Sequence, residues 1–393
     1  MPQVDDATAA GRLAGRHAIF LIVLLILGSR LVMLGAGHVW INSPEYNQSP
    51  PQLGFEAQLE RYRFSDVRWY QEIRDEGYEK RPYTEGRQAN WAFFPAWPLL
   101  WRVIDDVSDD VAGALVLNTA LFTVACAFAY NLLRNELGRR TALHAAVLLI
   151  VFPGAQFTMR PGPESLFLAA STVAIWAASR RGQWWALAAA GAVLATMSRP
   201  QGIVVLVPLA MLAVMQRKRG DRLSPYAVGT FLLPIGALVV FGLHLRDLTG
   251  NALAMFETHK AWDNGFALPF VALGQAVWHL AHQRLFDYYG FNLVPLSLAV
   301  LIAGVALSAW GWKERVLSTP LLAYGTAMLL VVLTRDSTQA AVRSVIVIFP
   351  LFGLAAAWLD RRSILYTGIV AIFAATSVFS YVAFVDQLLW ATT

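Results

Sequence analysis

Long apolar runs recur along the whole chain, and their length constrains the fold more than any other feature of the sequence. An α-helix needs roughly 20 residues to cross a hydrocarbon core about 30 Å thick, and many of these runs approach that length. Of the 393 residues, 57% are hydrophobic and only 15% are charged. This composition is too apolar for a soluble domain of this size. The sequence therefore predicts an all-α, polytopic membrane protein.

Turn and charge signals divide the apolar runs into about eleven predicted membrane-spanning helices. Their approximate limits are 17–38, 111–133, 141–158, 164–179, 184–198, 202–216, 225–245, 291–311, 319–334, 341–359 and 364–385. If the N-terminus is cytoplasmic, every predicted inside segment carries at least two basic residues. Cytoplasmic loops are enriched in lysine and arginine. We therefore predict a cell-membrane protein with its N-terminus inside and its C-terminus outside.

The first apolar run has a second interpretation. Basic residues precede it and the small residues of LGAGH follow it, as in a cleaved signal peptide. Its length from Ile19 to Leu34, and the presence of Arg30 within it, favour a membrane span instead.

Two predicted extracytoplasmic segments, 39–110 and 246–290, are much longer than the other connections. No clear internal repeat is present, which weighs against transporters built from two similar halves. The charged residues do not cluster on one soluble segment, which argues against a nucleic-acid partner. We predict one integral-membrane domain over residues 1–393, whose first long loop carries amphipathic surface helices.

The stretch FSDVRWYQEIRDEGY, residues 64–78, combines six charged residues with several aromatic ones. On a helical wheel its charges gather on one side, while Trp69, Tyr70 and Ile73 share the other. Asp66 falls in the middle of the aromatic side. This pattern predicts a helix that lies in the membrane surface with one carboxylate among aromatic side chains.

Asp66 has two compatible interpretations. With Ser65 it stands where a helix N-cap is expected, which requires no catalytic role. Alternatively, it is a functional carboxylate that faces a cleft. The aromatic segment NWAFFPAWPLLWRV, residues 90–103, has a similar ambiguity, because it fits an interfacial anchor as well as a wall for a lipid-linked substrate.

These stretches, DVRWYQEIRDEGY followed by AFFPAWPLLWR, resemble the PIG-V type mannosyltransferases. This family belongs to the GT-C class of polytopic glycosyltransferases, which use polyprenyl-phosphate sugars. Three later elements extend the resemblance over nearly the whole chain. They are PGPESLFL with Glu164, MSRPQGIV with Arg199 and Gly202, and VRSVIVIFPLF with Arg343. Ser65 and Ser344 stand where the family usually has Trp and Tyr, so the chain resembles a divergent bacterial member.

The resemblance implies a glycosyltransferase, and more narrowly a mannosyltransferase, with a GT-C type fold. Such an enzyme moves a sugar from a polyprenyl-phosphate donor to a lipid or glycan acceptor at the extracytoplasmic face, with inversion. The resemblance assigns the role of general base to Asp66. We expect no cofactor. We also expect no metal, because His259 with Glu257 and Asp263 has no metal-ligand spacing.

Several arginines lie at or near the outer ends of predicted spans, against the usual bias. Guanidinium groups bind phosphate oxygens through two parallel hydrogen bonds, so these arginines suit the donor phosphate. The alternative is that these arginines pair with Glu164, Asp336 or lipid headgroups.

In the second long loop, the stretch ETHKAWDNGFALPF either contacts the sugar or the acceptor or is simply a solvated loop. The predicted substrate contacts are Arg68, Trp69, Tyr70, Phe94, Arg160, Glu164, Arg199, Lys260 and Arg343.

Two other classes of function fit the sequence less well. A non-enzymatic lipid or solute transporter, such as a flippase, fits the many spans and the intramembrane Arg30 but lacks the expected related halves. An integral-membrane acyltransferase would need a histidine-centred site, and the histidines are scattered.

Overall fold

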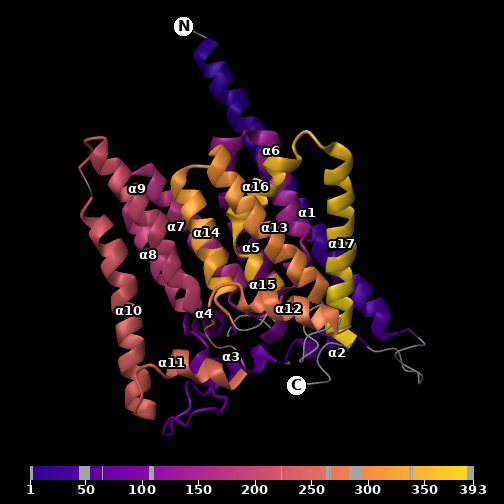
Figure 1. Cartoon of the computed structure of the whole chain (residues 1–393), viewed down its shortest axis with the longest axis vertical. Coiled ribbons are helices and arrows are strands. Elements are labelled where there is room, and N and C mark those ends of the chain that lie inside the picture. The colour runs from indigo at the N-terminus through magenta and orange to yellow at the C-terminus, as the bar shows by residue number, and fades with distance from the viewer. Residues whose placement is uncertain are drawn as a thin grey trace.

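The structure is a computed structural model that describes residues 3–43, 54–63, 65–105, 110–222, 224–262, 265, 267–282, 294–335, 338 and 340–386. Long helices stand side by side in one bundle, and short helices cover one end of it (Figure 1). The long helices are α1 (Gln3–Ile41), α5 (Asp110–Leu137), α10 (Pro225–Thr249), α13 (Val294–Glu314) and α17 (Ser363–Asp386).

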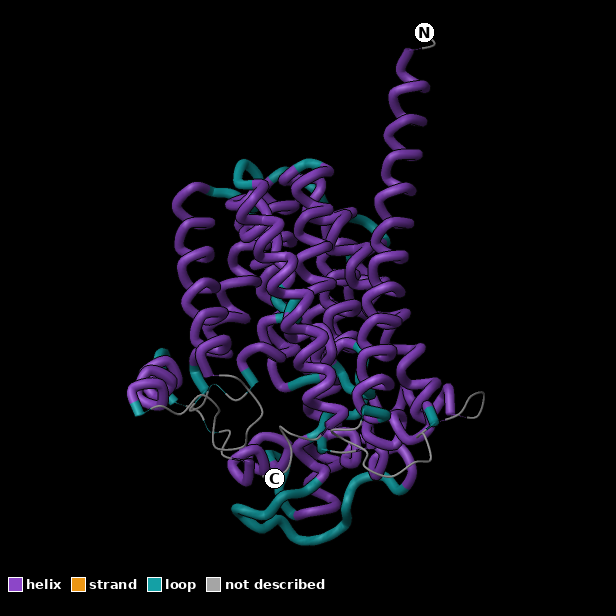
Figure 2. Tube along the Cα trace, turned by 90° about the vertical axis from the view of Figure 1, so that its right-hand side faces the viewer, coloured by secondary structure: helices purple, strands orange, loops and turns teal. Residues whose placement is uncertain are grey.

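Shorter helices fill the interior of the bundle. They are α6 (Arg139–Val151), α7 (Glu164–Arg180), α8 (Trp184–Ser198), α9 (Leu206–Lys218), α14 (Thr319–Leu333) and α16 (Phe349–Leu359). The end cover consists of α2 (Phe55–Glu60), α3 (Asp66–Asp75), α4 (Ala96–Asp105), α11 (Ala254–Glu257), α12 (Val271–Ala281) and α15 (Ala341–Val345). Figure 2 shows the same bundle after a quarter turn, with its helices roughly parallel.

Among the described residues, six helical stretches are long and apolar enough to cross a membrane. They are Gly15–Ile41, Val111–Leu137, Pro200–Lys218, Pro225–Thr249, Val294–Glu314 and Ser363–Asp386. A polytopic helical membrane protein is thus confirmed, whereas eleven crossings stay a prediction. The other five predicted ranges do fall on helices, but on the short ones α6, α7, α8, α14 and α16.

The short helices end early because the chain leaves the α-helical path inside the bundle. After α6 it forms a 3₁₀ turn, η3 (Pro153–Thr158), and it reaches α7 through Pro161, Gly162 and Pro163. After α8 it forms η4 (Pro200–Val205). Proline cannot donate the hydrogen bond that a helix interior requires. Non-helical backbone at membrane depth is tolerated only where protein or a polar cavity surrounds it.

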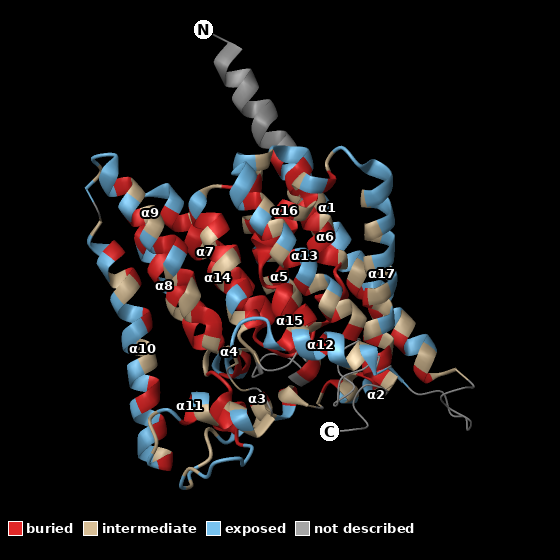
Figure 3. Cartoon of the chain, in the orientation of Figure 1, coloured by how far each residue is buried: buried red, intermediate tan, exposed pale blue. Residues whose placement is uncertain are grey.

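The connections that carry the basic clusters lie at the end of the bundle where the chain begins, opposite α2, α3, α11 and α12 (Figure 1). This arrangement agrees with the predicted orientation, which itself stays a prediction. Exposed apolar side chains line α10 and α17, while the buried residues concentrate between the helices (Figure 3). Helix α7 is buried on almost every side and so forms the centre of the bundle.

Close backbone contacts fix two of the non-helical segments. A Cβ atom at Gly202 in η4 would lie 1.9 Å from the carbonyl oxygen of Ala195 in α8. A Cβ atom at Gly154 in η3 would lie 2.8 Å from the carbonyl oxygen of Val342 in α15. Real Cβ atoms do not approach other atoms this closely. Only glycine therefore lets η4 lie against α8 and η3 against α15.

We predict that Gly202→Ala destabilises the protein by about 1–3 kcal/mol, because the new methyl group meets a backbone atom that cannot rotate away. The measurement is unfolding in mixed detergent micelles. Gly236→Ala, inside α10 with no atom within 4 Å of its ideal Cβ, is the matched control. It should leave stability unchanged or raise it by up to about 1 kcal/mol. Equal effects of the two substitutions would contradict the packing argument.

Candidate active site

Ion pairs link four chain segments where α3 meets the interior of the bundle. The Arg343 guanidinium in α15 donates hydrogen bonds to Asp66 Oδ2, at the start of α3, and to Glu164 Oε1, at the start of α7. Arg199, at the end of α8, places its Nη1 atom 3.1 Å from the same Glu164 oxygen. Asp66, Arg343, Glu164 and Arg199 thus form one continuous chain of charges, which we call the ion network.

Glu164 is the deepest member of the ion network, with only 2% of its side chain exposed. It is the first residue of α7, where the helix dipole favours a negative charge. Burying a carboxylate without a partner is very costly, so its two arginine partners stabilise the folded chain. The interior of the bundle is therefore built around a buried negative charge that pairs with Arg199 and Arg343.

Asp66 lies at the outer edge of the ion network, with 31% of its side chain exposed. Ser65 holds the N-cap position and Asp66 is the first helical residue, so its carboxylate faces Arg343 rather than capping α3. Ser65 has φ = 62°, a backbone conformation that is costly for a residue with a side chain. Such strain is retained only where the surroundings impose it, here immediately before a carboxylate that pairs across the fold.

The charge state of Asp66 follows from two opposing effects. Burial alone would raise the pKa of its carboxyl group. The Arg343 guanidinium, with two further arginines nearby, outweighs burial and holds that pKa below its ordinary value. Asp66 is therefore ionised at neutral pH.

The aromatic side of α3 packs as the helical wheel predicts. Trp69 stacks on Phe93 with ring centroids 6.0 Å apart and meets Trp262 edge-on at 5.9 Å. Tyr70 is buried and meets Phe93 edge-on at 5.0 Å. Since Trp262 belongs to the second long loop, these contacts join the two predicted outer loops beside Asp66.

Two further arginines, Arg160 and Arg30, are buried in the bundle. The Arg160 guanidinium lies 3.9 Å from the Phe384 ring centroid. Arg30 donates hydrogen bonds to the carbonyl oxygen of Ala155 at 3.1 Å and to Thr158 Oγ1 at 2.5 Å, both in η3. The partner expected for this intramembrane arginine is thus a set of neutral oxygens rather than a carboxylate.

Three predicted contacts lie away from the ion network. Arg68 is on the exposed side of α3, 3.7 Å from Glu72. Phe94 is buried against Phe241 and Phe256 in an apolar cluster. Lys260 forms an exposed pair with Glu85 at 3.3 Å. That Arg68, Phe94 and Lys260 contact the substrate stays a prediction.

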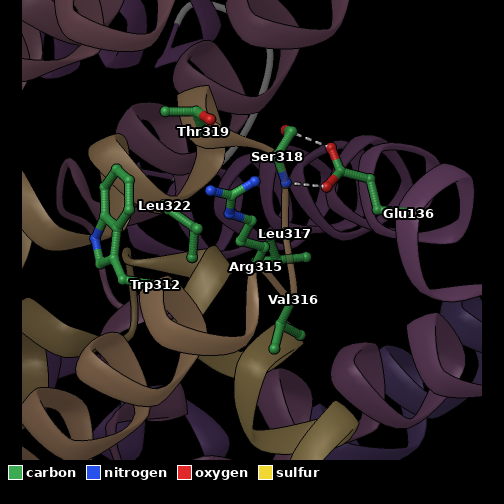
Figure 4. A pocket seen from close by; sticks show the side chains of 8 residues that line it. All are labelled: Glu136, Trp312, Arg315, Val316, Leu317, Ser318, Thr319 and Leu322. Atoms are coloured by element: carbon green, nitrogen blue, oxygen red, sulfur yellow. Dashed lines mark hydrogen bonds between the residues drawn. The ribbon is translucent and has the colours of Figure 1, made fainter.

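Two cavities near the surface of the described chain lie away from the ion network. One is an apolar groove between α4, α8 and α10, lined by residues that include Leu99, Val193 and Phe241. The other, at the opposite end of the bundle, is lined in part by Trp312 and Arg315 (Figure 4). There Ser318 donates two hydrogen bonds to the Glu136 carboxylate, which therefore caps α14.

The charges of the site indicate which kind of ligand it can bind. Among the described side chains of this group, Arg160, Arg199 and Arg343 bring three positive charges, and Asp66 with Glu164 brings two negative ones. An anionic group such as a phosphodiester is compatible with this excess of arginines. Within the described part of the chain, no cluster of three or more His, Cys, Asp or Glu residues is arranged to hold a metal ion.

Comparison with known proteins gives the fold. A family profile described as dolichyl-phosphate-mannose-protein mannosyltransferase matches residues 95–241, less than half of the chain. No protein of curated function matches the sequence. ArnT from Cupriavidus metallidurans, solved bound to undecaprenyl phosphate, aligns with a TM-score of 0.50 at 11% identity, over 94% of this chain and 77% of ArnT. The chain has a GT-C type fold.

A second solved structure also aligns with most of this chain. The apo oligosaccharyltransferase of Archaeoglobus fulgidus has a TM-score of 0.49 at 12% identity, over 96% of this chain. This chain spans only 56% of the length of that protein. The alignment with ArnT confirms the expected GT-C type fold, whereas the narrower PIG-V relationship stays a prediction.

We predict that Glu164→Gln destabilises the protein by about 3–5 kcal/mol, because it leaves Arg199 buried without a counter-charge. Unfolding in mixed micelles measures the change. Glu85→Gln is the matched control, since Glu85 pairs with Lys260 at the exposed surface, and it should cost less than about 1 kcal/mol. A loss below 1 kcal/mol for Glu164→Gln would show that the ion network is not structural.

We further predict that Arg343→Gln raises the pKa of Asp66, because burial then acts without the main cation that opposes it. Infrared titration of the carboxyl band measures this pKa, and Asp66→Asn identifies the band. Asp66 would then lose its charge at a higher pH as the solution is acidified. Arg68→Gln, an exposed change on the same helix, should leave the pKa almost unchanged. An unaltered pKa in Arg343→Gln would contradict the pairing.

Proposed function

We propose that this chain is a polyprenyl-phosphate-sugar-dependent glycosyltransferase of the GT-C class, acting at the extracytoplasmic face. One observation carries the proposal. Asp66, an ionised and partly exposed carboxylate, pairs with Arg343, and the buried Arg160 and Arg199 lie close enough for their charges to act on it. A base beside an anion site is what transfer from a phosphate-linked sugar requires.

In the proposed reaction, the acceptor oxygen attacks the anomeric carbon of the donor sugar. The new glycosidic bond forms as the bond from that carbon to the phosphate oxygen breaks, which inverts the anomeric configuration. The electron pair of the broken bond leaves with the polyprenyl phosphate. The acceptor proton passes to Asp66, so charge and atoms balance.

The arginines stabilise the charge that develops on the leaving phosphate. The donor is a phosphodiester with one negative charge, and the departing monoester gains a second. Fixed guanidinium groups in a site that excludes water stabilise such charge strongly. Arg160 and Arg199 are buried, so this role falls to them and to Arg343.

The low pKa of Asp66 fits a late proton transfer. A carboxylate paired with arginine is a weak base and removes a proton poorly from a free hydroxyl group. Glycosyl transfer proceeds through an oxocarbenium-like transition state, in which the anomeric carbon itself draws the acceptor oxygen in. The hydroxyl proton becomes acidic as that bond forms, and a weak base then suffices.

The sugar is proposed to be mannose. The resemblance to PIG-V type enzymes and the description of the matching family profile both support it. The undecaprenyl phosphate bound to ArnT supports a polyprenyl carrier. The acceptor is a lipid or glycan, and the proposed orientation has the N-terminus in the cytoplasm and the C-terminus outside.

We predict that Asp66→Asn lowers the rate of mannose transfer at least 100-fold, since the acceptor then has no base. The assay uses the full chain in proteoliposomes with radiolabelled polyprenyl-phosphate mannose and a lipid extract as acceptor. Glu76→Gln, an exposed change at the other end of α3, should retain the full rate. Undiminished transfer by Asp66→Asn would exclude Asp66 as the base. Absence of transfer by the unaltered chain would exclude this donor.

A further inference from the structure

A short turn of the second long loop lies against the site. It is η5 (Thr258–Trp262), which follows α11. Its last residue, Trp262, meets Trp69 at 5.9 Å and Phe93 at 5.7 Å between ring centroids. Gln88 in the first loop also donates a hydrogen bond to the carbonyl oxygen of Ala261. Contacts with α3 and with the part of the first long loop that follows it therefore hold η5 beside α3.

Neighbouring residues of η5 face opposite environments. Lys260 is exposed and pairs with Glu85 at the surface. His259 is only partly exposed, and its Nε2 atom is shielded from solvent. The charges that act on the imidazole are those of Arg335, Asp66 and Arg199, two of which belong to the ion network. His259 thus lies on the side of η5 that faces the site.

The Nε2 atom of His259 has no hydrogen-bond partner among the described residues. A buried polar atom without a partner costs about 1–3 kcal/mol. Burial and the nearby arginines outweigh Asp66 and lower the pKa of His259 to about 4. The imidazole is therefore neutral at neutral pH, and it offers one donor and one acceptor nitrogen.

We propose that His259 is a substrate-contacting residue whose Nε2 atom forms a hydrogen bond with a hydroxyl group of the sugar substrate bound beside Asp66. This inference rests on the proposed function and adds a residue to its site. A neutral imidazole suits a sugar hydroxyl, which both donates and accepts hydrogen bonds, whereas a charged one would compete with the arginines for the phosphate. The bound hydroxyl would also supply the partner that Nε2 lacks.

The test compares His259→Phe, which keeps a ring of similar shape, with His259→Gln, whose amide can reach the position of Nε2. We expect His259→Phe to lower kcat/KM for mannose transfer about 10- to 100-fold, because a site built to bond a hydroxyl loses that bond. His259→Gln should recover most of the loss. A raised KM for the donor alone would place the bonded hydroxyl on the transferred sugar. A raised KM for the acceptor alone would place the bonded hydroxyl on the acceptor.

A stability measurement separates this role from a structural one. Replacing an unpaired buried nitrogen with a phenyl ring should leave the Tm unchanged or raise it, whereas a structural histidine would lower it. His17→Phe, an exposed change in α1 at the opposite end of the bundle, is the control for both measurements. Wild-type kcat/KM in His259→Phe, with Asp66→Asn inactive, would overturn this inference and leave the proposed function standing. Absence of transfer by the unaltered chain would overturn both.

Discussion

The buried carboxylate of Glu164 is the charge on which the interior of this bundle depends. It begins the central helix α7, and it is neutralised by arginines from two other segments, α15 and the end of α8. A single buried carboxylate thereby fixes the relative positions of three segments that are distant in sequence. Arg343 extends the same interaction to Asp66, so the outer helix α3 is positioned from inside the bundle rather than from the surface. The position of the partly exposed carboxylate of Asp66 is thus a consequence of the buried carboxylate of Glu164.

The ion network depends on the short helices in the interior of the bundle. A guanidinium group at membrane depth is costly unless polar groups surround it. Helices that stop early bring their ends, with irregular backbone and polar side chains, into the middle of the bundle. Arg160, Glu164 and Arg199 all lie at or beside such ends. Gly154 and Gly202 allow the non-helical segments to pack closely enough for this arrangement.

The local parts of this structure could be predicted from the sequence, and the long-range parts could not. Helix α8 covers the predicted range 184–198, and α3 begins at Asp66 with its aromatic side packed as the helical wheel indicates. The number of crossings could not be resolved, because the breaks at Pro153 and Pro200 lie within runs that remain apolar on both sides. The pairing of Asp66 with Arg343 spans 277 positions, and no local pattern contains it. Only the resemblance to a family placed both residues in one site, and nothing in the loop sequence distinguished His259 from Lys260.

Arg343 couples the two halves of the proposed reaction through its charge. Before transfer it is shared between Asp66 and Glu164, which keeps Asp66 ionised and oriented. When the acceptor proton reaches Asp66, that carboxyl group becomes neutral and holds the guanidinium less strongly. At the same moment the departing phosphate gains a negative charge and attracts it more strongly. Proton transfer on one side of Arg343 therefore strengthens leaving-group stabilisation on the other. A lysine could not serve both sides equally well, because its single ammonium group lacks the planar fork that bonds two acceptors at fixed angles.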